Sequence, residues 1–261
     1  MRQRIALTLE YDGSGFSGWQ RQDHAPSVQQ ALEQALSGIA DQPVSVVCAG
    51  RTDAGVHAAA QVVHFDTSAA RPLHAWVLGS NSNLPASVSV LSAHLVAETF
   101  HARYSARRRA YRYAFLCRRA RPALLRNQVA WTHHALDAER MHEAAQALVG
   151  EHDFSAFRAV ACQARHPVRE VFSIRVQRRG ELVLIDVEAN AFLHHMVRNI
   201  AGTLLAVGAG EQEVQWPARL LVLGDRTRSG ITAPAVGLYL TRVLYEPEHG
   251  LPGEGRWPSL A

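Results

Sequence analysis

Lysine is absent from this sequence. All 27 basic residues among its 261 are arginine, and a base-composition bias of the source genome is the simplest origin of that usage. Chemistry through a lysine Schiff base or a Walker-type lysine is excluded, because both need a primary amine. Every charged contact to phosphate in this protein must therefore use a guanidinium or a histidine.

Cysteine and long apolar runs are scarce as well. The three cysteines, Cys48, Cys117 and Cys162, are far apart and odd in number, which indicates neither a disulfide framework nor a zinc cluster. No apolar run approaches the ~20 residues of a membrane-spanning helix. The N-terminal residues enter an alternating strand pattern rather than a signal-peptide core. These features predict a soluble cytoplasmic protein with no membrane segment.

Acidic residues are absent between Thr99 and Leu136, although nine arginines lie in that segment. They are Arg103, Arg107, Arg108, Arg109, Arg112, Arg118, Arg119, Arg121 and Arg126. A solvated charged face normally mixes both signs, so uncompensated arginines should repel one another unless a polyanion meets them. Interleaved tyrosines such as Tyr104 and Tyr111 suit stacking on bases as well. We therefore expect nucleic acid as the partner of this segment.

Short strands and helices are predicted in two comparable halves. Alternating apolar residues predict strands at 5–11, 44–48, 61–66, 87–95, 110–117, 171–177, 181–188 and 238–245. Helical spacing predicts helices at 27–40, 137–150, 192–207 and 216–223. Such a mixture favours an α+β fold with helices packed on a largely antiparallel sheet. The predicted halves are 1–105 and 106–246, followed by a loose tail at 247–261.

Two motifs suggest chemistry that the rest of the pattern does not support. The run Gly13–Gly18 spells G-x-G-x-x-G after a strand, but the next helix begins only near Ser27. These glycines therefore do not open a helix whose N-terminus could meet a pyrophosphate. The pairs His133-His134 and His194-His195 suggest a metal, yet adjacent histidines point in different directions and H-x-x-x-H spacing is absent. We expect neither a dinucleotide nor a metal.

The stretch AGRTDAGVH, residues 49–57, places one carboxylate, Asp53, where the strand 44–48 should end. In isolation a turn explains it, because an Asp side chain bonds nearby backbone N–H groups and Gly55 permits a positive φ. The rest of the chain has to decide between a turn residue and a functional carboxylate.

Several segments, in order, resemble the tRNA pseudouridine synthase A family, whose members isomerise uridine in the anticodon stem-loop of tRNA. The Gly-Arg-Thr-Asp-Ala-Gly block is highly specific on its own, and the match covers nearly the whole chain up to Pro247. The matching segments are 9–13, 18–22, 49–57, 83–85, 100–103, 111–113, 153–154, 157–158, 194–199 and 237–240. One departure is Ala156, where the family often carries serine.

The resemblance implies a role for several residues. Asp53 would be the catalytic aspartate, and Arg51 would help to displace the target base and fill the gap that it leaves. Tyr111 would stack on the flipped uracil and take part in the late proton transfer. Arg198 would pair with Asp53, and Leu238 would line the apolar wall of the pocket. Without the resemblance, Tyr111 would be an ordinary strand tyrosine, Arg198 a member of an ordinary ion pair, and Leu238 a core residue.

The resemblance also implies the architecture and the partners. Two α+β halves would share an extended sheet, with helices on one face and a basic active-site cleft between the halves, and two copies would form a homodimer. The expected activity is that of a tRNA pseudouridine(38–40) synthase, with Arg108 and Arg109 among the residues that bind the substrate. Because the isomerisation neither oxidises nor adds anything, no cofactor and no metal are expected.

Two other classes of protein remain as alternatives. A non-catalytic RNA-binding module would explain the arginine segment but not a lone aspartate paired with a distant arginine. A dinucleotide-dependent oxidoreductase would require the glycine run to bind a cofactor. Within the pseudouridine synthase interpretation, Asp53 has two open routes, attack on the uracil ring or on the anomeric carbon of the sugar.

Overall fold

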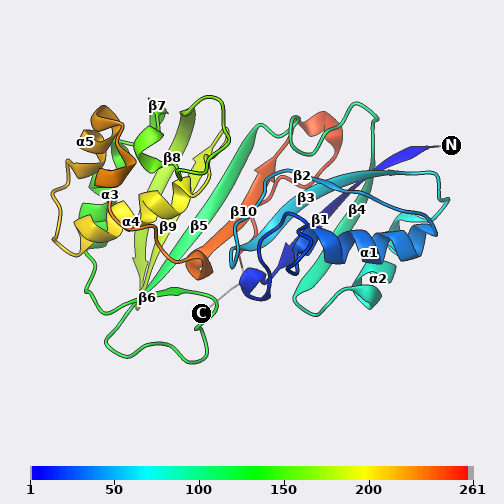
Figure 1. The fold of residues 1–261 in the computed structure, drawn as a ribbon, viewed down its shortest axis with the longest axis horizontal. Coiled ribbons are helices and arrows are strands. Elements are labelled where there is room, and N and C mark those ends of the chain that lie inside the picture. Colours follow the sequence, from blue (N-terminus) through cyan, green and yellow to red (C-terminus); the bar gives the residue numbers. More distant parts are fainter. Residues whose placement is uncertain (1, 258–261) are drawn as a thin grey trace. The chain divides into compact units, whose positions relative to one another are not determined.

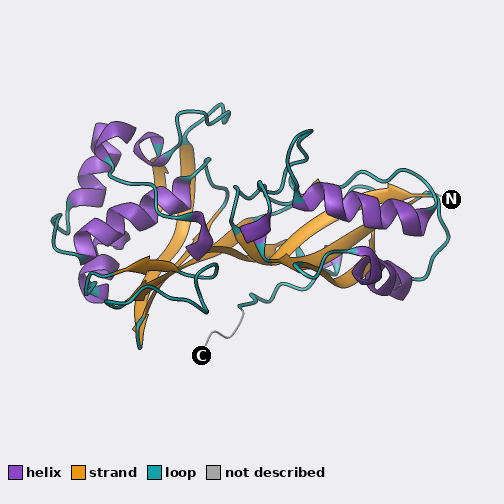
Figure 2. Ribbon diagram, turned by 60° about the horizontal axis from the view of Figure 1, so that its bottom comes forward, coloured by secondary structure: helices purple, strands orange, loops and turns teal. Residues whose placement is uncertain are grey.

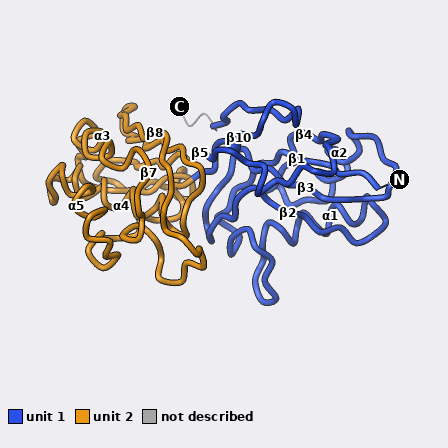
Figure 3. The backbone as a smooth tube through the Cα atoms, turned by 90° about the horizontal axis from the view of Figure 1, so that it is seen from above, with its two compact units in different colours: residues 1–109, 239–261 blue, residues 110–238 orange. Residues whose placement is uncertain are grey.

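The chain leaves its first folded unit and later returns to it. A computed structural model describes residues 2–257, and its two units are residues 1–109 with 239–261, and residues 110–238 (Figure 3). The crossings lie in strand β5 (Arg108–Cys117) and at the first residue of strand β10 (Leu238–Leu244). The predicted second half extended to residue 246, whereas residues from 239 onward belong to the first unit.

Strand β1 (Gln3–Tyr11) is an inner strand of the first unit. It pairs antiparallel with β3 (His57–Thr67) on one side and with β4 (Val88–Val96) on the other. Strand β3 also pairs with β2 (Val47–Cys48) and, in parallel, with β10. The β3–β10 pairing joins segments far apart in the sequence, so no local pattern could reveal it.

Both faces of β1 are buried, although the alternation of apolar and polar residues in its sequence suggests that only one face is buried. Ile5, Ala6 and Leu7 are each fully buried. Helices α1 (Val28–Ala40) and α2 (Leu73–Asn83) lie over these strands (Figure 1). Aromatic contacts such as that of Phe65 in β3 with Trp76 in α2, 5.1 Å between ring centroids, hold α2 there. Strands β1 and β3 are therefore buried on both faces, whereas β4 is partly exposed.

The C-terminal tail covers part of the same sheet. Its residues line a small cavity of about 40 Å³ together with side chains of β1, β3 and β10. Arg256 N–H donates to Thr241 O at 2.9 Å, and Trp257 packs edge-on against Tyr239. The described tail is thus held in place where the sequence predicts a loose segment, because the apolar sheet face needs cover. Residues 258–261, included in that prediction, lie outside the described residues.

Of the two helices of the first unit, the sequence predicts one and misses the other. Helix α1 begins after Ser27, whose side chain accepts a hydrogen bond from Gln30 N–H. It is followed by Asp41 in the left-handed region, so its bounds agree with the predicted helix 27–40. Helix α2 is not predicted, because its apolar residues follow no helical period. Its position depends on contacts with α1 and β4.

The second unit contains the remaining strands. Its strands follow the order β5, β9 (Leu182–Ala189), β8 (Val168–Arg179), β7 (Gly150–Asp153), and β6 (Ala130–Thr132) runs parallel to β5. Strands β8 and β9 form the hairpin that the sequence predicts. The short strands β6 and β7 are not predicted, since too few residues carry the alternation.

Three helices accompany these strands: α3 (Ala138–Gln146), α4 (Met196–Gly208) and α5 (Trp216–Leu223). Asp137 caps α3 as predicted. Helix α4 begins at Met196 rather than near residue 192, because His195 before it has a left-handed φ of 63°. Figure 2 shows the helices of this unit gathered on one side of its strands.

The described residues form ten strands, paired mostly antiparallel, and five α-helices. This confirms the predicted α+β class with a largely antiparallel sheet. Within residues 2–257, no helix has both the length and the apolar character needed to cross a membrane.

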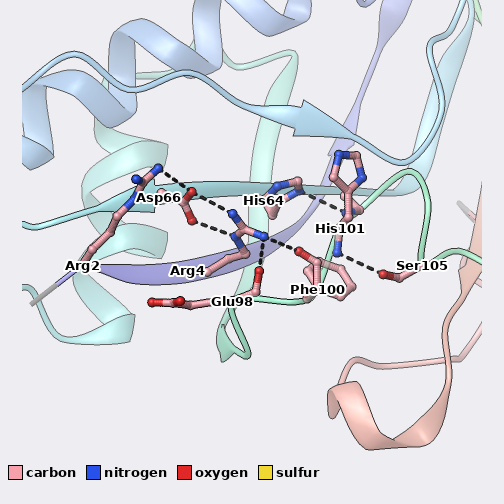
Figure 4. Close-up of polar contacts among 9 residues, drawn as sticks. Arg2, Arg4, His64, Asp66, Glu98, Phe100, His101 and Ser105 are labelled. Atoms are coloured by element: carbon pink, nitrogen blue, oxygen red, sulfur yellow. Dashed lines mark hydrogen bonds and ion pairs between the residues drawn. The ribbon is translucent and has the colours of Figure 1, made fainter.

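A polar cluster ties the segment after β4 to the sheet of the first unit (Figure 4). Arg4 forms a bidentate pair with Asp66, at 2.7 and 2.8 Å, and donates to Phe100 O at 2.7 Å. The hydrogen bond from Arg4 holds the pKa of Asp66 below its ordinary value. His64 is buried and accepts the Ala102 N–H at Nδ1, 3.1 Å away.

The pH dependence of stability should report on His64. Burial lowers the pKa of His64 to about 4, so the unfolded chain takes up this proton first as the pH falls. The free energy of unfolding should therefore decrease between about pH 6.5 and pH 4. His64→Gln keeps an acceptor for Ala102 and should flatten this part of the profile, measured by urea unfolding. The exposed control His74→Gln should keep the wild-type slope, and a wild-type slope in His64→Gln would contradict the prediction.

Candidate active site

The predicted catalytic carboxylate, Asp53, lies in the loop between β2 and β3. Ala49 N–H donates to Val62 O at 2.8 Å, which extends the β2–β3 pairing to the first residue of the loop. Val56 N–H donates to Asp53 O at 3.1 Å, and Gly55 adopts a φ of 78°. The turn therefore uses Gly55 as the sequence predicts, and it leaves the Asp53 side chain half-buried.

The run Gly13–Gly18 packs against this loop at backbone distance. A Cβ atom on Gly13 would lie 1.9 Å from Val56 O, and one on Gly18 would lie 2.9 Å from Thr52 O. Trp19 N–H donates to the same Thr52 O at 3.0 Å. Close packing thus explains both glycines, and the G-x-G-x-x-G spelling needs no dinucleotide.

A buried side-chain network holds the other side of the loop. Gln61 is fully buried and donates from Nε2 to Gly50 O at 2.6 Å. The Tyr11 hydroxyl lies 2.8 Å from Thr52 Oγ1 and accepts a longer contact, 3.4 Å, from Gln61 Nε2. The residues on both sides of Arg51 are therefore held, while the Arg51 side chain itself is exposed.

Arg109 ties the start of the loop to a neighbouring segment. Its guanidinium donates to Ala49 O from Nε at 3.2 Å and from Nη2 at 3.0 Å. It also donates to Arg103 O at 2.6 Å and to Ala106 O at 3.3 Å. The Arg109 side chain, predicted to meet the substrate, thus bonds three backbone carbonyls, whereas Arg108 is exposed.

The acid-free arginine segment is less uncompensated than its sequence suggests. Three of its arginines form ion pairs with acids from elsewhere in the chain: Arg107–Glu246, Arg112–Asp186 and Arg118–Glu181. The expectation that all nine are uncompensated is therefore wrong, because acids that are distant in the sequence can be neighbours in space. Six of the nine are exposed: Arg103, Arg107, Arg108, Arg119, Arg121 and Arg126.

The other predicted site residues belong to the second unit. Tyr111 on β5 is buried, and its ring meets Phe192 edge-on at 5.1 Å. Arg198 lies in the first turn of α4 and donates from Nε to Ala233 O at 2.8 Å, while Ala233 N–H donates to Arg198 O at 3.1 Å. Leu238 is buried at the start of β10.

Tyr113 bonds the segment that precedes Leu238. Its hydroxyl donates to Pro234 O at 2.7 Å, and a Cβ atom on Gly237 would lie 2.8 Å from Ala114 O. Burial raises the pKa of Tyr113, and the charge of Arg198 opposes that rise. Tyr113 therefore stays protonated and acts as a hydrogen-bond donor near Arg198.

The predicted site residues divide between the two units. Arg51, Asp53, Arg108 and Arg109 lie in the first unit, and Tyr111, Arg198 and Leu238 in the second. The sequence analysis assigned no role to Gln61. A polar residue at the start of the predicted apolar strand 61–66 is the feature that could have indicated one. Arg226, described below, was also missed, since it resembles any other surface arginine in the sequence.

An α+β fold with a carboxylate on a rigid loop, beside an exposed arginine, is the arrangement predicted above for an enzyme that acts on RNA. The profile of the family described as tRNA pseudouridine synthase matches residues 8–105 and 144–246. This chain belongs to that family.

The curated relatives agree with this assignment. A protein of Pseudomonas aeruginosa named tRNA pseudouridine synthase A is 56% identical over 250 residues, 95% of this chain and 88% of the relative. One of Coxiella burnetii with the same name is 54% identical over 249 residues, 95% of each chain. A chain in a crystal structure titled as a Cbf5-Nop10-Gar1 complex gives a TM-score of 0.36 at 12% identity. It covers 90% of this chain and 57% of that chain, and this weak likeness carries no argument.

The packing of the glycine run against the loop can be tested by two alanines. Gly13→Ala should lower the free energy of unfolding by about 1–3 kcal/mol, because its Cβ would overlap Val56 O. Gly15→Ala is the matched control, since a Cβ there meets nothing within 4 Å, and it should change stability by less than about 0.5 kcal/mol. Urea unfolding of both variants checks this, and equal losses would argue against close packing at Gly13.

Proposed function

We propose that this protein converts uridine to pseudouridine at positions 38–40 of the tRNA anticodon stem-loop, with Asp53 as the nucleophile. The observation that supports this most is the loop that carries Asp53. Backbone contacts with the run Gly13–Gly18 and hydrogen bonds from Gln61 hold that loop from two sides. A carboxylate held in this way suits a reaction in which a positioned group attacks the substrate.

The isomerisation breaks the N-glycosidic bond, rotates the uracil and joins its carbon to the sugar. Because the base is detached in between, the enzyme has to hold it and exclude water. Asp53 attacks either the uracil ring or the anomeric carbon, forming a covalent bond that is later broken to release the product. The chain requires no cofactor or metal for these steps, since nothing is oxidised or added.

Arg51 serves the step in which the target base leaves its stack. Flipping a base costs a few kcal/mol, and a side chain that enters the gap offsets part of that cost. The Arg51 side chain is exposed, while its neighbours Gly50 and Thr52 are held by Gln61 and Tyr11. A long side chain on such an anchored backbone suits insertion into an RNA helix.

The residues of the second unit receive the roles that the resemblance assigns. Tyr111 stacks on the flipped uracil, and the edge-on contact with Phe192 supports a fixed orientation of its ring. Arg198 pairs with Asp53 during the reaction, and its bond to Ala233 O supports an aimed guanidinium. Leu238, which is buried, contributes to the apolar wall.

The substrate contacts follow from charge. Exposed Arg108 binds the phosphate backbone, and Arg109 contributes through the loop that its guanidinium holds. With a sequence pI near 9.3, the chain favours a polyanionic partner. Two copies form a homodimer that acts on tRNA, and the enzyme works in the cytoplasm, where the family's substrate is found.

The nucleophile assignment is tested by Asp53→Asn, which keeps the size of the side chain but removes its negative charge. We expect no detectable pseudouridine when tRNA is mapped before and after treatment, whereas wild type should modify positions 38–40. Affinity for tRNA and the thermal midpoint should stay close to wild type. Asp23→Asn, in an exposed loop of the same unit, is the control and should retain full activity.

A turn role for Asp53 predicts the opposite result, since asparagine is tolerated in such turns. Turnover of Asp53→Asn within tenfold of wild type, a loss below about 1.4 kcal/mol of transition-state stabilisation, would overturn the assignment. Activity at other uridines, with Asp53 still essential, would leave the chemistry in place and reject positions 38–40.

The role of Arg108 is tested by salt dependence. Arg108→Ala should weaken tRNA binding and reduce the slope of log K against log salt by about one, as expected for one lost phosphate contact. Arg109→Ala should also lower the free energy of unfolding, because its guanidinium bonds Ala49 O. Arg219→Ala, which breaks a surface pair with Glu213, is the control. A wild-type slope in Arg108→Ala would show that this residue does not contact RNA phosphate.

A further inference from the structure

The loop of residues 226–233 lies directly against helix α4 of the second unit. A Cβ atom on Gly202 would lie 2.0 Å from Ile231 O, so helix and loop meet at backbone distance. Thr203 of α4 also bonds the loop, because its hydroxyl donates to Ser229 O at 3.0 Å. The position of the loop therefore depends on contacts with the first two turns of α4.

Arg226 is the centre of the hydrogen bonds within this loop. Its Nη1 donates to Ser229 Oγ at 2.8 Å and to Gly230 O at 3.0 Å. Its Nη2 donates to Thr232 Oγ1 at 2.8 Å and to Asn199 Oδ1, on α4, at 3.1 Å. One planar guanidinium thus joins three points of the loop to the helix, which the single charge centre of a lysine could not do.

Thr232 and Asn199 complete the connection. Thr232 Oγ1 accepts from Arg226 and donates to Asn199 Oδ1 at 2.7 Å. Asn199 is fully buried and donates from Nδ2 to Phe157 O at 2.7 Å, so its amide is fixed from both ends. Buried polar groups that are satisfied in this way are costly to rearrange.

The residues next to Asn199 and Thr232 in the chain are also bonded to each other, and one of them is Arg198. Asn199 directly follows Arg198, and Thr232 directly precedes Ala233, whose carbonyl accepts from Arg198 Nε at 2.8 Å. Ala233 N–H returns a bond to Arg198 O at 3.1 Å. The side-chain contact 199–232 therefore lies one residue away, on both segments, from the hydrogen bond between Arg198 Nε and Ala233 O.

We infer that Thr232, which is held by Arg226 and bonded to Asn199, is a positioning residue that aims Arg198. The inference rests on the proposed role of Arg198 in pairing with the reacting carboxylate. A guanidinium recognises a carboxylate best when its plane is correctly oriented. Misplacing a positioned group by about 1 Å can cost on the order of 100-fold in rate. The loop thus contributes to catalysis without touching the substrate.

The test removes one hydroxyl from the network. Thr232→Val keeps the shape of the side chain, and we expect the single-turnover rate of pseudouridine formation at saturating tRNA to fall at least tenfold. The Kd for tRNA should stay within twofold of wild type. Thr232→Ser returns the hydroxyl and should restore the rate to within threefold. All variants are compared at a temperature where circular dichroism shows them folded.

Thr227→Val is the matched control, because its hydroxyl belongs to the same loop but bonds Asp225 Oδ1 instead. Its rate should stay within twofold of wild type. A wild-type rate for Thr232→Val would overturn the inference, as would a loss that Thr232→Ser does not restore. An equal loss in Thr227→Val would also overturn it, since that would indicate a general effect on the loop.

A double-mutant cycle separates this inference from the proposed function. Arg198→Lys lacks Nε and should lower the rate on its own. Adding Thr232→Val should then cost less than twofold more, because the group that the network aims is gone. Losses that multiply would show that Thr232 does not act through Arg198. A wild-type rate for Arg198→Lys would instead reject the proposed role of Arg198.

Discussion

The close approach of two backbone segments is the constraint on which the Asp53 loop depends. Gly13 and Gly18 leave no space for side chains where they meet Val56 and Thr52, so the path of the loop is set by its neighbours. On the other side, buried Gln61 bonds the backbone of Gly50. A carboxylate on such a loop has little freedom to reorganise, which is what a preorganised site requires.

The second unit reaches a similar result by other means. Its charged group, Arg198, lies on a helix, and a carbonyl of the facing loop holds its Nε. That carbonyl is itself placed by the contact between Thr232 and Asn199. In one unit tight backbone packing positions a carboxylate, and in the other a partly buried polar network positions a guanidinium.

A chain whose basic residues are all arginine uses guanidinium groups for three different tasks. Some form ion pairs, as Arg112 does with Asp186. Others donate to several neutral acceptors at once, because five donors lie in one planar fork. Arg109 bonds three backbone carbonyls, and Arg226 bonds one carbonyl and three side-chain oxygens. A third group, which includes Arg108, has side chains exposed to solvent. The net charge of a segment therefore overstates its capacity to bind nucleic acid.

Local chemistry allowed the sequence by itself to determine much of this protein. Apolar periodicity and capping specify α1 and the β8–β9 hairpin, and turn chemistry places Asp53 in a loop with Gly55 at positive φ. Only the tertiary structure decided that β10 pairs with β3, that the tail packs on the sheet, and that Arg109 bonds the loop. Periodicity, caps and turns involve residues within a few positions of one another. Strand pairing, charge compensation and carbonyl contacts join residues that are distant along the chain, and they exist only once it has folded.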